Sequence, residues 1–127
     1  MLSNSPRSTL IGAACLLFLF SLAGCASVQN SVFPIGSVSY PAKPKDAAVD
    51  VFREELPSRD YQEIARLNVH LEKTFFIKSA FAEALPRLQQ LAREQGADAI
   101  IEIEEERSQL NETFIYNVKA VAIVFTD

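Results

Sequence analysis

The chain has 127 residues, which is enough for one small domain. It holds 16 acidic residues against 12 basic ones, so its formal net charge is −4. This balance argues against nucleic-acid binding, which needs clustered positive charge, and against electrostatic attachment to anionic lipid head groups.

The N-terminal segment is typical of a secretory signal. A polar stretch with one basic residue, Arg7, precedes the apolar run at residues 10–20, LIGAACLLFLF. This run has the length of the apolar part of a signal peptide and is shorter than the roughly 20 residues that a membrane-spanning helix needs. Small residues follow it, so residues 1–24 are predicted to be a signal peptide.

The four residues Leu22-Ala23-Gly24-Cys25 resemble a bacterial lipobox. The resemblance implies cleavage between Gly24 and Cys25 and a diacylglyceryl thioether on the Cys25 sulfur, with acyl chains such as palmitate. Two acyl chains already anchor a protein stably in a membrane. By the sorting convention of such lipoproteins, Ala26 in place of Asp implies the bacterial outer membrane, with the domain facing the periplasm. Ordinary secretory cleavage at the same small residues is the alternative.

Cleavage at this site would leave Cys25 as the sole cysteine, because Cys15 is removed with the signal. The mature chain would then have no second thiol for a disulfide and no cysteine cluster for a metal. Its fold must depend on burial of apolar side chains. We expect no metal and no cofactor.

Residues 25–46 are predicted to be the lipidated cysteine and a flexible tether. The segment is rich in serine and contains Gly36, Pro34, Pro41 and Pro44, all of which interrupt regular structure. Its last 21 residues would reach about 70 Å if fully extended, at roughly 3.3 Å per residue.

Two strands are expected next. Residues 47–52, AAVDVF, place Val49 and Val51 on one face of a short strand. Residues 61–71, YQEIARLNVHL, alternate between apolar and polar side chains, which is typical of a half-buried strand. Its apolar face would carry Ala65, Leu67, Val69 and Leu71, and its polar face Arg66, Asn68 and His70.

Residues 80–95, AFAEALPRLQQLAREQ, have helical periodicity. Ser79 is expected to cap the helix start, and Gly96 stands where a left-handed residue usually ends a helix. Pro86 removes a backbone donor. The helix is therefore expected either to continue through Pro86 with a kink, which we favour, or to begin near Leu85.

Residues 97–106 and 114–126 are predicted to be the last two strands, joined by a turn. The second half of 114–126 is apolar on both faces, which indicates an interior strand. Residues 47–127 are thus expected to form an α+β domain of order β-β-α-β-β. Its single helix would pack on a four-stranded, mainly antiparallel sheet.

The stretch from Ala92 to Ile101 ends a helix, passes through Gly96-Ala97-Asp98-Ala99 and enters an isoleucine-rich strand. It resembles small domains of the YbjQ type and the domain of the outer-membrane stress-sensor lipoprotein of the Rcs phosphorelay, over about residues 47–126. The resemblance implies a small α+β domain. The Rcs sensor domain has disulfides, which Cys25 alone cannot form, and the metal-binding label of some YbjQ-type domains finds no Cys or His cluster here.

Few residues suggest chemistry. His70 is the only histidine, and no nucleophile motif accompanies it, so we interpret it as a surface residue. Glu102 and Glu104 share a strand face and could bind a hard cation such as calcium, but we favour the interpretation as a solvated strand end. Asp98 is expected to accept backbone N–H groups at the helix-to-strand joint.

The connection after residue 71 contains Phe75, Phe76 and Ile77. These side chains either close the core below the helix start or form an exposed site for a partner. The sequence therefore favours a lipid-anchored, non-enzymatic module that binds an envelope protein, in assembly, maintenance or stress sensing. The alternative is a small ligand- or metal-binding domain that uses the acidic strand end.

Overall fold

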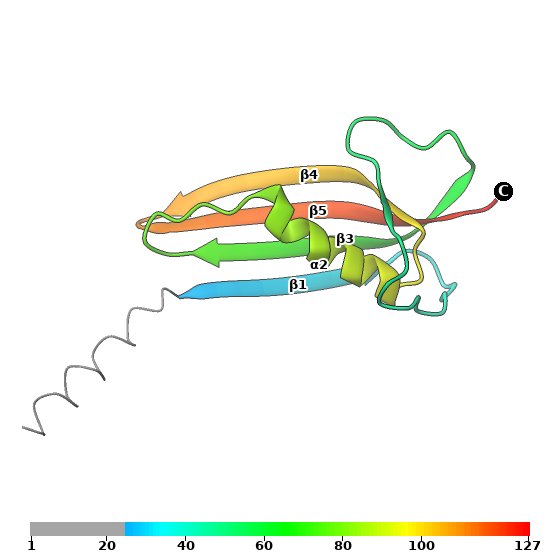
Figure 1. The fold of residues 1–127 in the computed structure, drawn as a ribbon, viewed down its shortest axis with the longest axis horizontal. Coiled ribbons are helices and arrows are strands. Elements are labelled where there is room, and N and C mark those ends of the chain that lie inside the picture. Colours follow the sequence, from blue (N-terminus) through cyan, green and yellow to red (C-terminus); the bar gives the residue numbers. More distant parts are fainter. Residues whose placement is uncertain (1–24) are drawn as a thin grey trace, which may run out of the picture.

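The computed structural model describes residues 25–127; the predicted signal peptide, with Gly24, lies outside them. The domain is α+β, as expected, with one helix on a five-stranded mixed sheet of order β1-β3-β5-β4-β2 (Figure 1). The elements are β1 (Ala26–Pro34), β2 (Asp50–Val51), β3 (Tyr61–Lys73), α2 (Phe81–Glu94), β4 (Ala99–Leu110) and β5 (Thr113–Phe125). The helix within residues 25–127 lacks the length and apolar character needed to cross a bilayer.

The prediction of a flexible tether over residues 25–46 is wrong for its first part. Residues 26–34 form β1, which pairs antiparallel with β3 along its whole length, from Ala26 opposite Lys73 to Pro34 opposite Ala65. The sheet therefore has five strands instead of four. Val32 packs against the core while most of β1 is exposed, since an edge strand needs little apolar surface. Its serines belong to this solvated strand and do not mark a loop.

The rest of the expected tether is held against the domain. The Ile35 N–H donates to the Ile64 carbonyl at 2.8 Å, and the Lys43 N–H donates to the Arg93 carbonyl at 2.8 Å. Tyr40 packs against the main core. We call residues 35–49 the strap, because they bind the far end of the sheet to the end of α2.

β2 is shorter than the predicted strand 47–52. It pairs in parallel with β4, Asp50 opposite Ala99 and Val51 opposite Ile100, and this pairing makes the sheet mixed. β3 and β5 lie antiparallel in the centre, with a bulge between Glu63 and Ala65. β4 and β5 form a long hairpin that continues to Leu110, beyond the predicted strand end at residue 106.

The helix α2 continues through Pro86, which faces solvent. The predicted cap is wrong: Ala80 is the N-cap, and Ser79 is buried with a hydroxyl that has no partner among residues 25–127. Instead, the Glu83 carboxylate accepts a hydrogen bond from the Ala80 N–H at 3.1 Å, which satisfies one of the free donors at a helix start. Gly96 ends the helix with a φ of +78°, as predicted.

Apolar side chains cover both sides of the sheet, but unequally. Between sheet and helix, the main core joins the predicted inward face of β3 to the buried face of α2, including Leu88, which has no exposed surface. On the opposite side, a smaller cluster of Ile101, Val121 and Ile123 is confined to one end of the sheet. The second half of β5 is thus an interior strand, as predicted, and apolar side chains cover it on both sides.

Candidate functional site

Cys25 lies at one end of the sheet, directly before the first residue of β1. Its side chain is exposed and forms no disulfide. The Thr74 hydroxyl donates to the Cys25 carbonyl at 3.3 Å, so the residue predicted to carry the lipid is next to the connection between β3 and α2. No spacer separates it from the folded domain.

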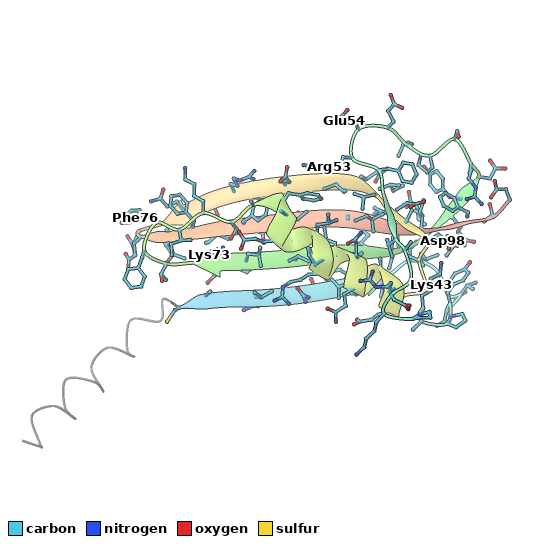
Figure 2. The ribbon with its side chains drawn as sticks, viewed as in Figure 1. Lys43, Arg53, Glu54, Lys73, Phe76 and Asp98 are labelled. Carbon is cyan, nitrogen blue, oxygen red and sulfur yellow. The ribbon has the colours of Figure 1, made fainter. Side chains whose placement is uncertain are left out.

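The connection presents Phe75, Phe76 and Ile77 to solvent. Their exposed fractions are 63%, 65% and 51%, so the interpretation as core residues is wrong. Leu110, at the end of the neighbouring hairpin, is 66% exposed. We call these four residues the apolar tip. Figure 2 shows Phe76 at this end of the molecule, with Lys43 and Asp98 at the opposite end.

The backbone of the apolar tip is unusual. Phe75 and Phe76 have φ values of +56° and +59°, a region that bulky side chains rarely occupy. The Phe76 N–H donates to the Glu112 carbonyl at 2.8 Å, and its ring meets the Phe114 ring edge-on, with 6.4 Å between centroids. Such strain costs of the order of 1–3 kcal/mol per residue and persists only where surrounding contacts impose it.

A polar face covers much of the sheet opposite the helix. It includes Arg66, Asn68 and His70, as predicted, together with Asn117 and Lys119 of β5. His70 is held by both ring nitrogens: Nδ1 lies 2.6 Å from the Asn117 Oδ1, and Nε2 lies 2.8 Å from the Glu72 Oε1. The bond to Glu72 raises the pKa of His70 above its usual value, against the opposing effect of partial burial. Because both ring nitrogens of His70 already have partners, we interpret it as a structural residue.

Glu102 and Glu104 line one shallow hollow on the polar face, so the structure does bring them together. Arg66 and Lys119 line the same hollow, and Lys119 is the cross-strand partner of Glu104. The hollow therefore carries both signs of charge, and Glu104 faces a cation across the strand pair. Within residues 25–127, no group of three or more metal-binding side chains is formed here or elsewhere.

A bulge between Ile101 and Glu104 redirects the acidic run. Glu102 has a φ of +49°, and the extra residue moves Glu105 onto the helix side of the sheet. There the Tyr116 hydroxyl donates to Glu105, which also pairs with Arg53 at 3.0 Å. Burial and this bond raise the pKa of Tyr116 to about 12. Nothing in the sequence indicated this network, since a bulge leaves no regular pattern.

Asp98 joins three parts of the chain, as predicted for the helix-to-strand joint. Its carboxylate accepts the Phe125 N–H at 2.8 Å and pairs with Lys43 of the strap. Partial burial raises the pKa of Asp98, but the bonds from Lys43 and Phe125 outweigh that effect and lower it below its usual value. Asp98 therefore holds the strap in place, and its carboxylate is already used by these structural contacts.

No protein-family model matches the chain. No curated protein sequence matches it either. Among solved structures, it is similar to a Francisella virulence factor, FvfA, with a TM-score of 0.54 and 20% sequence identity. The match covers 80% of this chain and 100% of that one. At this identity the likeness establishes a shared fold.

Proposed function

We propose that this chain is a lipoprotein of the bacterial outer membrane, anchored through acyl chains on Cys25, and that its periplasmic domain binds an envelope protein without catalysing a reaction. The position of Cys25 is the observation that carries the proposal. The Cys25 thiol is exposed, forms no disulfide and lies at the extreme end of the sheet, where acylation would disturb no packing.

The polar face supports a binding role. If the Cys25 end meets the membrane, this face stands beside the anchor and stays open to the periplasm. Its mixed charges, Arg66 and Lys119 beside Glu102 and Glu104, suit a protein surface of complementary pattern. β1 adds an edge of nine residues, and an edge strand offers backbone donors and acceptors to a partner strand.

The titratable side chains that could act in catalysis support a binding role instead, because their polar groups already have hydrogen-bond or ion-pair partners within the domain. His70 is held between Asn117 and Glu72, Asp98 holds the strap, and Glu105 holds Tyr116 and Arg53. A general acid or base must instead reach a substrate proton. The roles suggested for such a module are envelope assembly, maintenance or stress sensing.

Two measurements test the proposal. Mass spectrometry of the native protein should find an N-terminal Cys25 with fatty acyl chains; an unmodified terminus would contradict the anchor. Photo-cross-linkers at Gln29 and Lys119 of the polar side should trap a discrete envelope protein in cells, while the exposed helix residue Gln90 should not. Equal trapping from all three positions, or none, would remove the assignment of this face.

A further inference from the structure

We propose that the apolar tip inserts into the membrane interface beside Cys25, so that the domain contacts the bilayer through protein side chains as well as through the acyl chains. The inference rests on the proposed lipid anchor and deepens it. It assigns Phe75, Phe76, Ile77 and Leu110 to a lipid surface, in place of the protein partner that the sequence suggested.

The first argument is the absence of a spacer between the anchor and the sheet. The strand residue Ala26 follows Cys25 and is already paired with Lys73. Lys73 lies opposite Phe114, and the same hairpin end carries Leu110 opposite Thr113. The start of β1, the loop after β3 and the turn after β4 therefore form one end of the domain (Figure 1). A thioether on Cys25 must bring that end to the bilayer surface.

The second argument is the composition of this end. Its four apolar side chains are each at least half exposed, and a protein surface seldom gathers so much apolar area without a binding role. Phenylalanine and leucine are the residue types that interfacial segments bury at the boundary between head groups and acyl chains. Phe75 and Phe76 keep positive φ values while their side chains stay exposed, and a lipid contact would offset the cost of this backbone strain.

The charges around the tip agree with a lipid surface. Lys78 lies over the Phe114 ring, 5.4 Å from its centroid, and Lys73 pairs with Glu83. Long amines can keep their stems along apolar surface and extend the charged group to lipid phosphates. Glu112 is the acidic residue of the turn, and its carbonyl faces the loop to accept the Phe76 N–H. This end thus carries both signs of charge, with Lys73 and Lys78 among the acidic residues Glu72, Glu83 and Glu112.

The orientation follows directly. β3 spans 13 residues, or about 40 Å at roughly 3.3 Å per residue. The strap, with Lys43, would then lie at the far end, away from the bilayer (Figure 2). The polar face would extend from the membrane toward that end.

A tryptophan reporter tests the inference, because the chain contains no tryptophan. Full-length protein, processed and lipidated in cells, is reconstituted into phosphatidylethanolamine–phosphatidylglycerol vesicles as the Phe76→Trp variant. Phe75→Trp serves as a second reporter should the first disturb the fold. Leu56→Trp is the matched control, since Leu56 is 57% exposed in the distal loop.

We expect the tip reporters to emit at shorter wavelength in vesicles than in detergent-free buffer. Aqueous acrylamide should quench them several-fold less than Leu56→Trp, and lipids brominated near the head group should quench them strongly. A tip reporter that acrylamide quenches as freely as Leu56→Trp would overturn the inference. A tip reporter that neither acrylamide nor brominated lipid quenches would also overturn the inference, because it would indicate a protein neighbour or a second copy of the chain.

The two proposals fail differently. Protein that does not float with vesicles and has an unmodified Cys25 removes the lipid anchor and this inference together. Protein that floats through its acyl chains but leaves both tip reporters open to acrylamide removes this inference alone.

Discussion

Replacing Gly96 with alanine should loosen the strap from the helix end. A Cβ at this position would lie 2.5 Å from the Pro41 carbonyl oxygen and 2.7 Å from the Tyr40 Cβ, and the φ of +78° disfavours any L side chain. The left-handed conformation alone costs alanine about 1–2 kcal/mol. The clash is with backbone, so the strap must move and lose the bond from the Lys43 N–H to the Arg93 carbonyl, worth about 1 kcal/mol. Alanine also restricts the unfolded chain, which offsets about 0.4–1 kcal/mol, so we expect a total loss of about 2 kcal/mol.

Gly36→Ala is the matched control. Gly36 has a φ of +76°, almost the same as Gly96, but a Cβ there would meet nothing within 4 Å. It should lose about 1 kcal/mol or less, because alanine also lowers the entropy of the unfolded chain by an offsetting amount of about 0.4–1 kcal/mol. Urea unfolding followed by circular dichroism measures both variants. If the two variants lost the same stability within about 0.5 kcal/mol, the reasoning would be refuted. The clash with the strap is the difference between the two sites, and it would then have no effect on stability.

Three further predictions follow from burial and titration. Leu88→Ala, at a fully buried position, should cost about 2–5 kcal/mol of unfolding free energy, against about 0.5 kcal/mol or less for the exposed Leu56→Ala; similar values in urea unfolding would contradict the core assignment. Because the pKa of His70 is raised in the folded state, its charged form stabilises the fold fully below pH 6.5, and this stability is lost as the pH rises through the folded pKa. In proton NMR the single histidine should titrate above pH 6.5, and His70→Gln should remove this part of the pH dependence of stability. Tyrosine absorbance near 295 nm should include a step at about pH 12 that is missing in Tyr116→Phe, and an unchanged curve would exclude the Glu105 bond.

Side-chain periodicity predicted most of the central fold. The alternation from Ala65 to Leu71 identified the inward face of β3. The helical spacing of apolar side chains predicted one inward stripe on α2, formed by Phe81, Leu85, Leu88, Leu91 and Ala92; the last three are buried, and Phe81 and Leu85 are half-buried. These predictions succeeded because burial on one side imposes a regular repeat of two or of 3.6 residues. Gly96 and Asp98 were also identified, since a left-handed helix end and a joint between elements have local chemical requirements.

β1 could not be recognised in the same way. An edge strand in which only Ser31 and Val32 are half-buried needs no apolar face, so its serines and proline suggested a loop. The bulge at Glu102 and the network around Glu105 were missed for a related reason. An extra residue changes which face the following side chains occupy, and no regular pattern in the sequence marks it.

The sequence by itself determined the α+β class and the faces of the regular elements, and it predicts the anchor at Cys25, because each of these depends on residues close together in the chain. Only the tertiary structure decided that β1 begins directly after Cys25 and that Phe75, Phe76, Ile77 and Leu110 meet at the same end. That meeting depends on pairing between strands far apart in sequence, from Ala26 with Lys73 to Leu110 with Thr113. No local pattern encodes such pairing, since it is selected by the packing of the whole sheet.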